Sequence, residues 1–240
     1  MEIISLIPAR AGSKGVLDKN IRNLGGHPLL EWSIKASLLS ESISRTIVST
    51  DSISYQEIAI SSGAEAPFLR PPSISADTSG DIEFVLHALT ELEKSGYTPD
   101  YIVHLRPTTP IRKPEVIEEA ISTLNNDGVW TSLRSVHEMS ESAYKSFEIE
   151  ESDFLVSAFV RNRDLEKSNL GRQEFPKTYQ ANGYVDILSV EEIKNTGKIH
   201  GNSVLAFLTE PVIEIDTSFD FELAEAICQS RPELAERLFG

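Results

Sequence analysis

The chain opens with a short apolar run, Ile3 to Ile7, that leads directly into a loop rich in glycine and basic residues. Such a run, bounded by glycines, predicts a buried strand that ends in a turn. Glycine allows positive φ, so the turn can bring several backbone N–H groups close to an anion. The loop reads PARAGSKGVLDKN over residues 8–20, which matches neither G-x-x-x-x-G-K-[ST] nor G-x-G-x-x-G. We therefore expect a nucleotide-binding turn that belongs to neither the P-loop NTPases nor the dinucleotide enzymes.

The charge of this loop contrasts with the rest of the chain, which carries 37 Asp and Glu against 22 Lys and Arg, a net charge of −15. The loop region holds four cations opposed only by Asp18, namely Arg10, Lys14, Lys19 and Arg22. A basic spot on an acidic body concentrates its field on an anion such as a polyphosphate. An ordinary solvated turn is the alternative. The acidic balance argues against sequence-independent binding to nucleic acid, which needs a basic surface.

Cysteine content and hydropathy exclude further classes of protein. The one cysteine, Cys228, excludes an intramolecular disulfide and a cysteine-based zinc site. No apolar stretch approaches the roughly 20 residues that span a bilayer. No basic segment precedes the first apolar run, as a signal peptide would require. We expect a cytoplasmic protein with no membrane partner, built as one domain or as one domain with an insertion.

Strand-like and helix-like segments alternate along the first half of the chain. Residues 3–8, 45–50, 101–105 and 129–136 have strand character, and residues 28–39, 54–61, 79–94 and 114–124 have helical spacing. This alternation predicts an α/β fold, a mostly parallel sheet with helices on both faces. Ligands of such sheets bind beyond the carboxyl ends of the strands. Polar clusters at residues 10–14, Asp51 and residues 106–109 each follow a predicted strand, so we expect them to converge on one edge.

Residues 137–177 interrupt this pattern with charged and polar sequence and scattered aromatic residues. The segment is either a flexible insertion or an extension that packs on a second subunit. Regular patterns return at residues 178–190, 204–208 and 212–216, and a final helix is predicted over residues 219–230. We therefore expect one α/β domain made of residues 1–136 and 178–240, with residues 137–177 inserted into it.

Two carboxylates near the end of the chain form a candidate metal site. Glu214 and Asp216 lie two residues apart on the strand predicted over residues 212–216, so their side chains point to the same face. Mg²⁺ prefers carboxylate and phosphate oxygens as ligands. The alternative is a pair of solvated charges, which the apolar residues around them disfavour.

Seven short motifs occur in order along nearly the whole chain. They are IPARAGSKG…KN at 7–20, STD at 49–51, LRP at 69–71, ADTSGD at 76–81, LRPTTPIR at 105–112, ANGYVDI at 181–187 and EID at 214–216. Together they resemble the motifs of the acylneuraminate cytidylyltransferases, the CMP-sialic acid synthetase family. The first motif and the P-T-T-P element are the most specific parts of the resemblance.

The resemblance implies a Rossmann-like nucleotidyltransferase fold and an enzyme that joins CTP to a nonulosonic, sialic-type acid with loss of pyrophosphate. The anomeric hydroxyl of the sugar would attack the α-phosphorus of CTP with the help of Mg²⁺, the implied cofactor. Residues 137–177 match the family's dimerisation extension in position, so the resemblance implies a homodimer. The product would serve the biosynthesis of cell-surface polysaccharide.

The family's functional residues map onto this sequence motif by motif. For CTP the matches are Arg10, Ser13, Lys14, Lys19, Asn20, Arg70 and Asp81, and the catalytic set is Arg10, Lys14 and Asp216. For the sugar the matches are Arg106, Thr108, Thr109, Lys145, Arg172, Gln180 and Asn182, and for the metal they are Asp216 and Glu214. Transfer to phosphorus depends mainly on positioning and charge neutralisation, which accounts for the cations in the nucleotide set.

Two positions depart from the family pattern. Glu214 stands where the family has Asp, and its longer side chain can reach a metal through water or bind a second ion. Arg106 stands where some sialic acid members have Gln, and a guanidinium can bind a carboxylate through two oxygens. The second departure admits other nonulosonic acids, such as legionaminic or pseudaminic acid, in place of Neu5Ac.

Several matched residues also have a structural alternative. Asn20 can be a turn or cap residue, and Asp81 can be a favourable charge at the start of a helix. Thr108 and Thr109 can be turn residues between prolines. No general base is visible, because we expect His104 to be a packed core residue. A metal that lowers the pKa of the attacking hydroxyl would make a strong base unnecessary.

Two other functions compete with this interpretation. The first is a cytidylyltransferase for the eight-carbon acid KDO, a related fold and reaction, against which the extension at 137–177 argues. The second is a non-catalytic nucleotide-binding relative. The presence of Arg10, Lys14, Lys19 and Asp216 together argues against that second interpretation.

Overall fold

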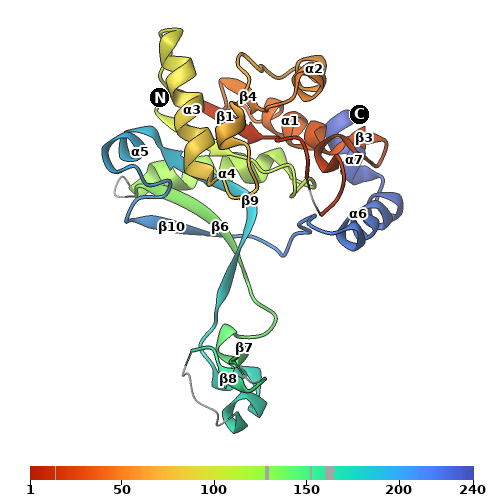
Figure 1. Ribbon diagram of the computed structural model, residues 1–240, viewed down its shortest axis with the longest axis vertical. Helices are drawn as coiled ribbons and strands as arrows, with labels where there is room; N and C mark the ends of the chain where they lie inside the picture. Colours follow the sequence, from red (N-terminus) through yellow and green to blue (C-terminus); the bar gives the residue numbers. More distant parts are fainter. Residues whose placement is uncertain (14, 128–129, 152, 160–164) are drawn as a thin grey trace.

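A six-stranded sheet with the strand order β10-β6-β9-β5-β1-β4 forms the centre of the molecule (Figure 1). The computed structural model describes all residues except 14, 128–129, 152 and 160–164. The sheet strands are β1 (Ile3–Pro8), β4 (Arg45–Ser49), β5 (Tyr101–His104), β6 (Ser132–Glu138), β9 (Tyr179–Ser189) and β10 (Val204–Leu208). β1 pairs in parallel with β4 and β5, and β10 with β6, whereas β9 runs antiparallel between β5 and β6. The predicted mostly parallel α/β fold is confirmed, with one antiparallel strand that the sequence did not indicate.

The first strand, β1, is apolar throughout because the protein covers both of its faces. Ile4 and Leu6 belong to one hydrophobic core and Ile3 and Ile7 to the other, each with no more than 3% of its surface exposed. A strand buried on both faces has a continuous apolar sequence instead of an alternating one. Its place inside the sheet puts the glycine-rich loop at the carboxyl edge.

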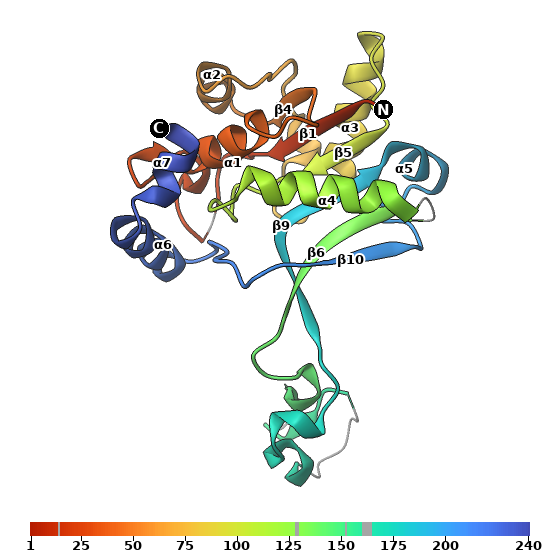
Figure 2. The ribbon, with the colours of Figure 1, turned by 180° about the vertical axis from the view of Figure 1, so that it is seen from behind.

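Helices cover both faces of the sheet. α3 (Asp81–Lys94) and α5 (Val190–Thr196) pack on one face, which is turned to the viewer in Figure 1. The other face carries α1 (Leu29–Leu38), α2 (Ile53–Ser61), α4 (Pro114–Asp127), α6 (Ser218–Ser230) and α7 (Glu233–Phe239), with α4 in front in Figure 2. A short hairpin of β2 (Asn23–Leu24) and β3 (His27–Pro28) precedes α1. None of the helices in the described part of the chain is both long and apolar enough to cross a bilayer.

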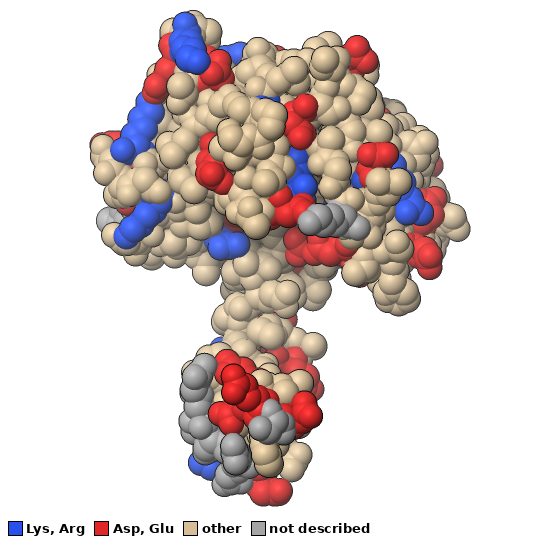
Figure 3. Space-filling model, in the orientation of Figure 1, with Lys and Arg blue, Asp and Glu red and all other residues tan. Residues whose placement is uncertain are grey.

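Strands β6 and β9 extend beyond the body as a two-stranded stalk, and their pairing continues as far as Glu138 opposite Tyr179. The chain between them forms a small lobe with the hairpin β7 (Phe147–Ile149) and β8 (Leu155–Ser157) (Figures 1 and 2). Acidic side chains gather on the visible face of this lobe (Figure 3). The lobe lies within the segment whose sequence pattern differs from the rest.

Expectations for the last third of the chain need correction. Residues 212–216 were predicted to form a strand, but they form an extended segment outside the sheet. The N–H of Ile215 donates to the carbonyl oxygen of Thr108 at 2.7 Å, so the segment packs on a loop. Ile215 is fully buried, which accounts for the apolar sequence, but the segment pairs with none of the strands in the described part of the chain. Helices α5 and α7 were not predicted, since each is only seven residues long.

Candidate active site

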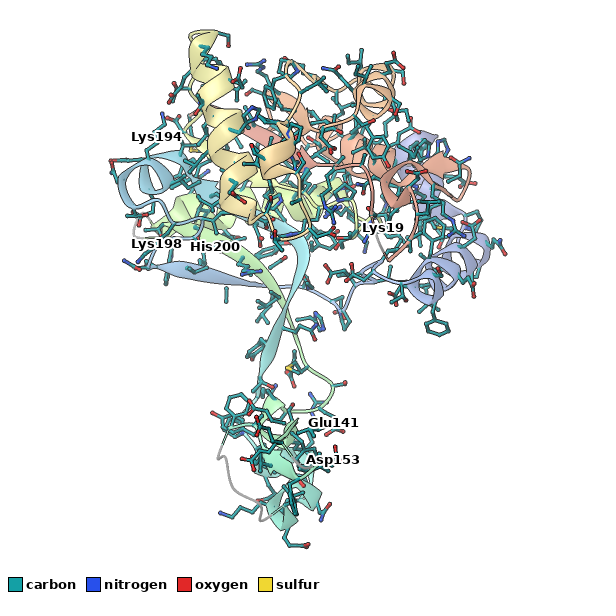
Figure 4. All side chains as sticks on the ribbon, in the orientation of Figure 1. Lys19, Glu141, Asp153, Lys194, Lys198 and His200 are labelled. Atoms are coloured by element: carbon teal, nitrogen blue, oxygen red, sulfur yellow. The ribbon has the colours of Figure 1, made fainter. Side chains whose placement is uncertain are left out.

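The basic loop after β1 folds back against the extended segment near the end of the chain. The Lys19 ammonium group donates to the carbonyl oxygen of Ile215 at 2.7 Å and to Oδ1 of Asp216 at 3.2 Å. Gly15 lies so close that a Cβ added to it would be 2.3 Å from the carbonyl oxygen of Asp216. Lys19 and Asp216, almost 200 positions apart in sequence, are therefore in direct contact, and Figure 4 shows the place of Lys19 in the body.

Hydrogen bonds inside the loop fix its shape. The Asn20 side chain is 5% exposed and donates from Nδ2 to the carbonyl oxygen of Arg10 at 3.0 Å. Asp51, two residues beyond the end of β4, accepts a hydrogen bond from the N–H of Ala11 at 2.8 Å. Ser13 is half-buried, and Lys14 lies outside the described residues. Asn20 thus supports the loop, which agrees with the structural alternative given for it above.

The predicted nucleotide set includes two arginines, of which Arg10 belongs to this loop and Arg70 lies near it. The Arg10 guanidinium forms an ion pair with Asp77 at 2.5 Å, and both side chains remain about one-third exposed. Arg70 is 5% exposed and donates to the carbonyl oxygen of Ser49 at 2.7 Å, while its guanidinium lies 4.7 Å from the centre of the Phe84 ring. Burial lowers the pKa of Arg70 to about 10, so it stays charged at neutral pH.

Arg106 does not project freely into solvent, as a clamp for a sugar carboxylate would. It donates to Oδ2 of Asp186 at 2.9 Å and to Oδ2 of Asp81 at 2.7 Å. Burial opposes its charge, but the Asp186 and Asp81 carboxylates outweigh burial and raise the pKa of Arg106. Arg134 approaches the other oxygen of Asp186, with Nε 3.8 Å from Oδ1. Asp186 is fully buried, so Arg106 serves as its main counter-ion.

A third arginine, Arg112, was not among the predicted site residues, although it ends the LRPTTPIR motif. Its side chain is fully buried and donates to the carbonyl oxygens of Tyr184, Arg106 and Gly183 at 2.6 to 2.8 Å. It also donates to Oγ of Ser33 at 2.9 Å. Burial lowers the pKa of Arg112 to about 9. This guanidinium joins the turn at Arg106 to strand β9, and its position within a quoted motif was the signal that could have identified it.

The predicted sugar residues of the body form a hydrogen-bonded group. Thr109 donates from Oγ1 to the carbonyl oxygen of Asn182 at 3.2 Å. The Asn182 side chain accepts from Ser135 at 2.8 Å and donates to Thr209 at 2.7 Å, so its amide is occupied inside the protein. Thr108 contributes its carbonyl oxygen to the extended segment, as described above.

The predicted sugar residues of the lobe lie away from this group within a single chain. Lys145 pairs with Glu141 at 3.1 Å, and Glu141 lies in the lobe, far below Lys19 in Figure 4. Arg172 pairs with Glu138 at the end of β6, and Gln180 is exposed on the stalk. Within the described part of the chain, no hydrogen bond or ion pair joins these three side chains to Arg106.

Glu214 and Asp216 are exposed on either side of the buried Ile215, as alternation along an extended segment requires. The protein packed around Glu214 and the neighbouring Asp216 carboxylate raise the pKa of Glu214. Two carboxylates that repel each other in this way fit a divalent cation, which would relieve the repulsion. Among the described residues, no group of three or more His, Cys, Asp or Glu could hold a metal. Oxygens from a phosphate or water would complete the coordination.

His104, the last residue of β5, is a core residue, as expected from the sequence. It is fully buried, its ring lies 5.5 Å from that of Phe84, and neither ring nitrogen has a hydrogen-bond partner among the described residues. Burial, with a further contribution from Arg106, holds the pKa of His104 well below its usual range. A neutral imidazole enclosed in the core cannot exchange protons with a bound substrate.

Comparison with known proteins gives matches over almost the whole chain. A family model described as Cytidylyltransferase matches residues 4–236. A CMP-N,N'-diacetyllegionaminic acid synthase from Legionella pneumophila is 32% identical over 236 residues, which cover 97% of this chain and 99% of that protein. An N-acylneuraminate cytidylyltransferase from Escherichia coli is 34% identical over 96% of this chain, and the match spans 53% of that longer protein.

Among solved structures, a CMP:2-keto-3-deoxy-manno-octonic acid synthetase complexed with CTP aligns with a TM-score of 0.72. The alignment covers 96% of this chain and 100% of that one, with 15% sequence identity. At this identity the likeness shows the fold alone. It agrees with the nucleotidyltransferase fold that the motifs implied.

The lowered pKa of His104 predicts a specific loss of stability in acid. The unfolded chain binds a proton at this residue near pH 6.5 and the folded chain does not, so this contribution is complete above that pH and is lost as the pH falls below it. Relative to His104→Leu, the wild type should lose about 1.4 kcal/mol of unfolding free energy between pH 7.5 and 5.5. Urea unfolding of both proteins at the two pH values measures the difference, and equal pH dependence would contradict the assignment.

Proposed function

We propose that this chain, which belongs to the cytidylyltransferase family and is a nucleotidyltransferase of the CMP-sialic acid synthetase type, activates a nonulosonic acid with CTP. The products are the CMP-sugar and pyrophosphate. The observation that carries the proposal is the contact of the basic loop, through Lys19 and Gly15, with the segment that holds Glu214 and Asp216. Cations for phosphates and carboxylates for a metal thus face each other at the sheet edge where α/β folds bind ligands.

The proposed CTP site consists of the matched residues around the loop. They are Arg10, Ser13, Lys14, Lys19, Asn20, Arg70 and Asp81. Arg10 is partly exposed and can offer its guanidinium to phosphate oxygens in place of Asp77. Asn20 acts through the shape of the loop, because its amide is bonded to the carbonyl oxygen of Arg10. Lys14 would complete the set of cations, and its role is supported by the match to the family motif.

We propose that Asp216 and Glu214 hold Mg²⁺. When bound, the metal would lower the pKa of the attacking anomeric hydroxyl and offset charge on the phosphates. Lys19 holds the Asp216 carboxylate in place through Oδ1. In the transfer, the anomeric oxygen forms a bond to the α-phosphorus, the bond between the α- and β-phosphates breaks, and pyrophosphate leaves with both bonding electrons. The hydroxyl proton passes to solvent, since no described side chain is placed as a general base.

The sugar is proposed to bind beside Arg106, with Thr108, Thr109 and Asn182 shaping its pocket. A guanidinium has five N–H donors, and the two ion pairs of Arg106 use two of them, so Arg106 can still donate to the sugar. Lys145, Arg172 and Gln180 are proposed to reach the pocket from the lobe and stalk of a second chain. A KDO-specific enzyme is not favoured, because the likeness to the KDO synthetase concerns the fold alone.

We propose that residues 137–177, which include the lobe, are a dimerisation extension that binds a second copy of the chain. Several large apolar side chains of this lobe are exposed, including Phe147 at 43%, Ile149 at 72% and Leu170 at 49%. Exposed apolar side chains that gather on one small unit are typical of an interface. The proposed homodimer is a cytoplasmic enzyme with small-molecule partners.

Sedimentation velocity tests the dimer. The wild type should sediment at twice the 26.6 kDa mass of the chain. The double variant Ile149→Glu/Leu170→Glu should sediment as a monomer, because each charge would be buried at the interface. Ile60→Glu/Leu223→Glu introduces the same charges at exposed body positions and should leave the dimer intact. A monomeric wild type would contradict the proposal.

Pyrophosphate release from CTP and Mg²⁺ tests the activity, with Neu5Ac, legionaminic acid, pseudaminic acid and KDO as acceptors. We expect release with at least one of the nine-carbon acids. In Asp216→Asn, kcat/KM for that acid should fall about 100-fold or more, because the loss of a metal ligand removes several kcal/mol of transition-state stabilisation. Glu222→Gln removes an equivalent charge from the exposed face of α6 and should retain full activity.

Three results of this assay would overturn parts of the proposal. Release with KDO alone would assign the protein to the eight-carbon acids. Binding of CTP without release for any of the four acids would favour a non-catalytic nucleotide-binding protein. Full activity of Asp216→Asn in Mg²⁺ would remove Asp216 from the metal site.

A further inference from the structure

A cavity of about 580 Å³ opens on the side of the body that carries α4. We call it the rear pocket; it lies between the start of α4, the segment that follows β10, and helices α6 and α7, which are seen together in Figure 2. Small-molecule sites have volumes of about 300–1,000 Å³. None of the residues proposed to bind CTP, the metal or the sugar lines the rear pocket.

The walls of the rear pocket are mainly apolar and come from three parts of the chain. Val116 comes from α4, Phe207 and Val212 come from the segment around and after the end of β10, and Ile227 and Leu234 come from α6 and α7. An apolar enclosure of this kind suits a ligand with an apolar body, whose burial is favourable.

Charged residues at the same pocket are predominantly basic. Lys113, Arg231 and Arg237 are exposed at its rim, and none of them forms an ion pair within the described part of the chain. Arg112 forms part of the lining, and no described carboxylate lies within ion-pair distance of its guanidinium. The lining therefore contains four basic residues and only two acidic ones, Glu119 and Glu210, although the chain as a whole has a net charge of −15.

We propose that the rear pocket is a second ligand site, and that it takes an amphipathic organic anion. The apolar body of the ligand would lie against the walls from α4, β10 and α7. Its carboxylate, sulfonate or phosphate group would face Lys113, Arg231 and Arg237, since a local excess of basic charge on an acidic protein selects anions. This inference does not depend on the reaction proposed above.

The position of the rear pocket connects it to the catalytic edge through the backbone. The wall at Val212 and Ile213 continues directly into Glu214. Arg112, which lines the pocket, also donates to the carbonyl oxygens of Arg106 and Gly183. A bound anion would therefore restrain the segment that carries the carboxylates, and amide hydrogen exchange over residues 207–213 should slow when the pocket is filled.

The test uses 8-anilinonaphthalene-1-sulfonate, an aromatic sulfonate whose fluorescence rises in an apolar site. Titration into the full chain should give saturable binding, and saturating CTP should not displace the probe. The double variant Arg231→Glu/Arg237→Glu reverses two charges at the rim and should weaken binding at least tenfold. Lys94→Glu/Lys198→Glu makes the same change of charge at exposed residues outside the pocket and should bind as the wild type does.

A filled pocket gives an independent test that changes no charge. Val116→Trp occupies the cavity from a half-buried position on α4 and should abolish saturable binding, with circular dichroism confirming that the variant is folded. The neutral analogue N-phenyl-1-naphthylamine should bind at least tenfold more weakly than the sulfonate. Equal affinity of the wild type and the Arg231→Glu/Arg237→Glu variant, or displacement of the probe by CTP, would overturn the proposal.

Discussion

The contact between Lys19 and the segment Ile215–Asp216 joins the loop after β1 to a segment near the end of the chain, and the rest of the site depends on it. An ammonium group that is mostly buried donates to a backbone oxygen and to a carboxylate at once. Such charge-assisted hydrogen bonds are stronger than neutral ones. Gly15 makes the contact possible, because any side chain there would collide with the carbonyl oxygen of Asp216. The loop and the carboxylate pair are thus parts of one unit.

Arg106 and Arg112 stabilise the turn at residues 106–112, on which the segment with Ile215 packs. Arg112 donates to three backbone carbonyl oxygens in the core, and a buried carbonyl left without a donor costs about 1–3 kcal/mol. Arg106 balances the fully buried Asp186, and removal of one partner from such a pair is costly because it leaves the other charge uncompensated. Arg106, where the family resemblance suggested a sugar contact, therefore has a structural task that a substitution would disturb.

The sequence predicted those parts of the fold that depend on local pattern. The apolar run of β1, the amphipathic α3 and the polar residues at strand ends follow from periodicity and position. The direction of β9 could not be predicted, because a buried strand has the same composition whether it runs parallel or antiparallel. The pairing of Arg106 with Asp186 follows from the register of β5 against β9, which periodicity does not contain.

The site could be predicted to the level of its motifs but not of its contacts. The cation-rich loop and the EID segment were identified in the sequence, and their mutual contact required the fold. The amide of Asn20 and the guanidinium of Arg70 look available for a ligand in the sequence, but the structure bonds them to backbone oxygens of Arg10 and Ser49. Such interactions with the main chain leave no periodic signal.

The central claim is that the loop binds CTP only while it is docked on the Asp216 segment. Calorimetric titration of CTP with Mg²⁺ into Gly15→Ala tests this most directly, because the added methyl group would lie 2.3 Å from the Asp216 carbonyl oxygen and force the two apart. Gly80→Ala is the matched control, since its methyl group would meet only Ile82, at 3.9 Å. We predict at least tenfold weaker CTP binding by Gly15→Ala and unchanged binding by Gly80→Ala. Wild-type affinity in Gly15→Ala would contradict the account.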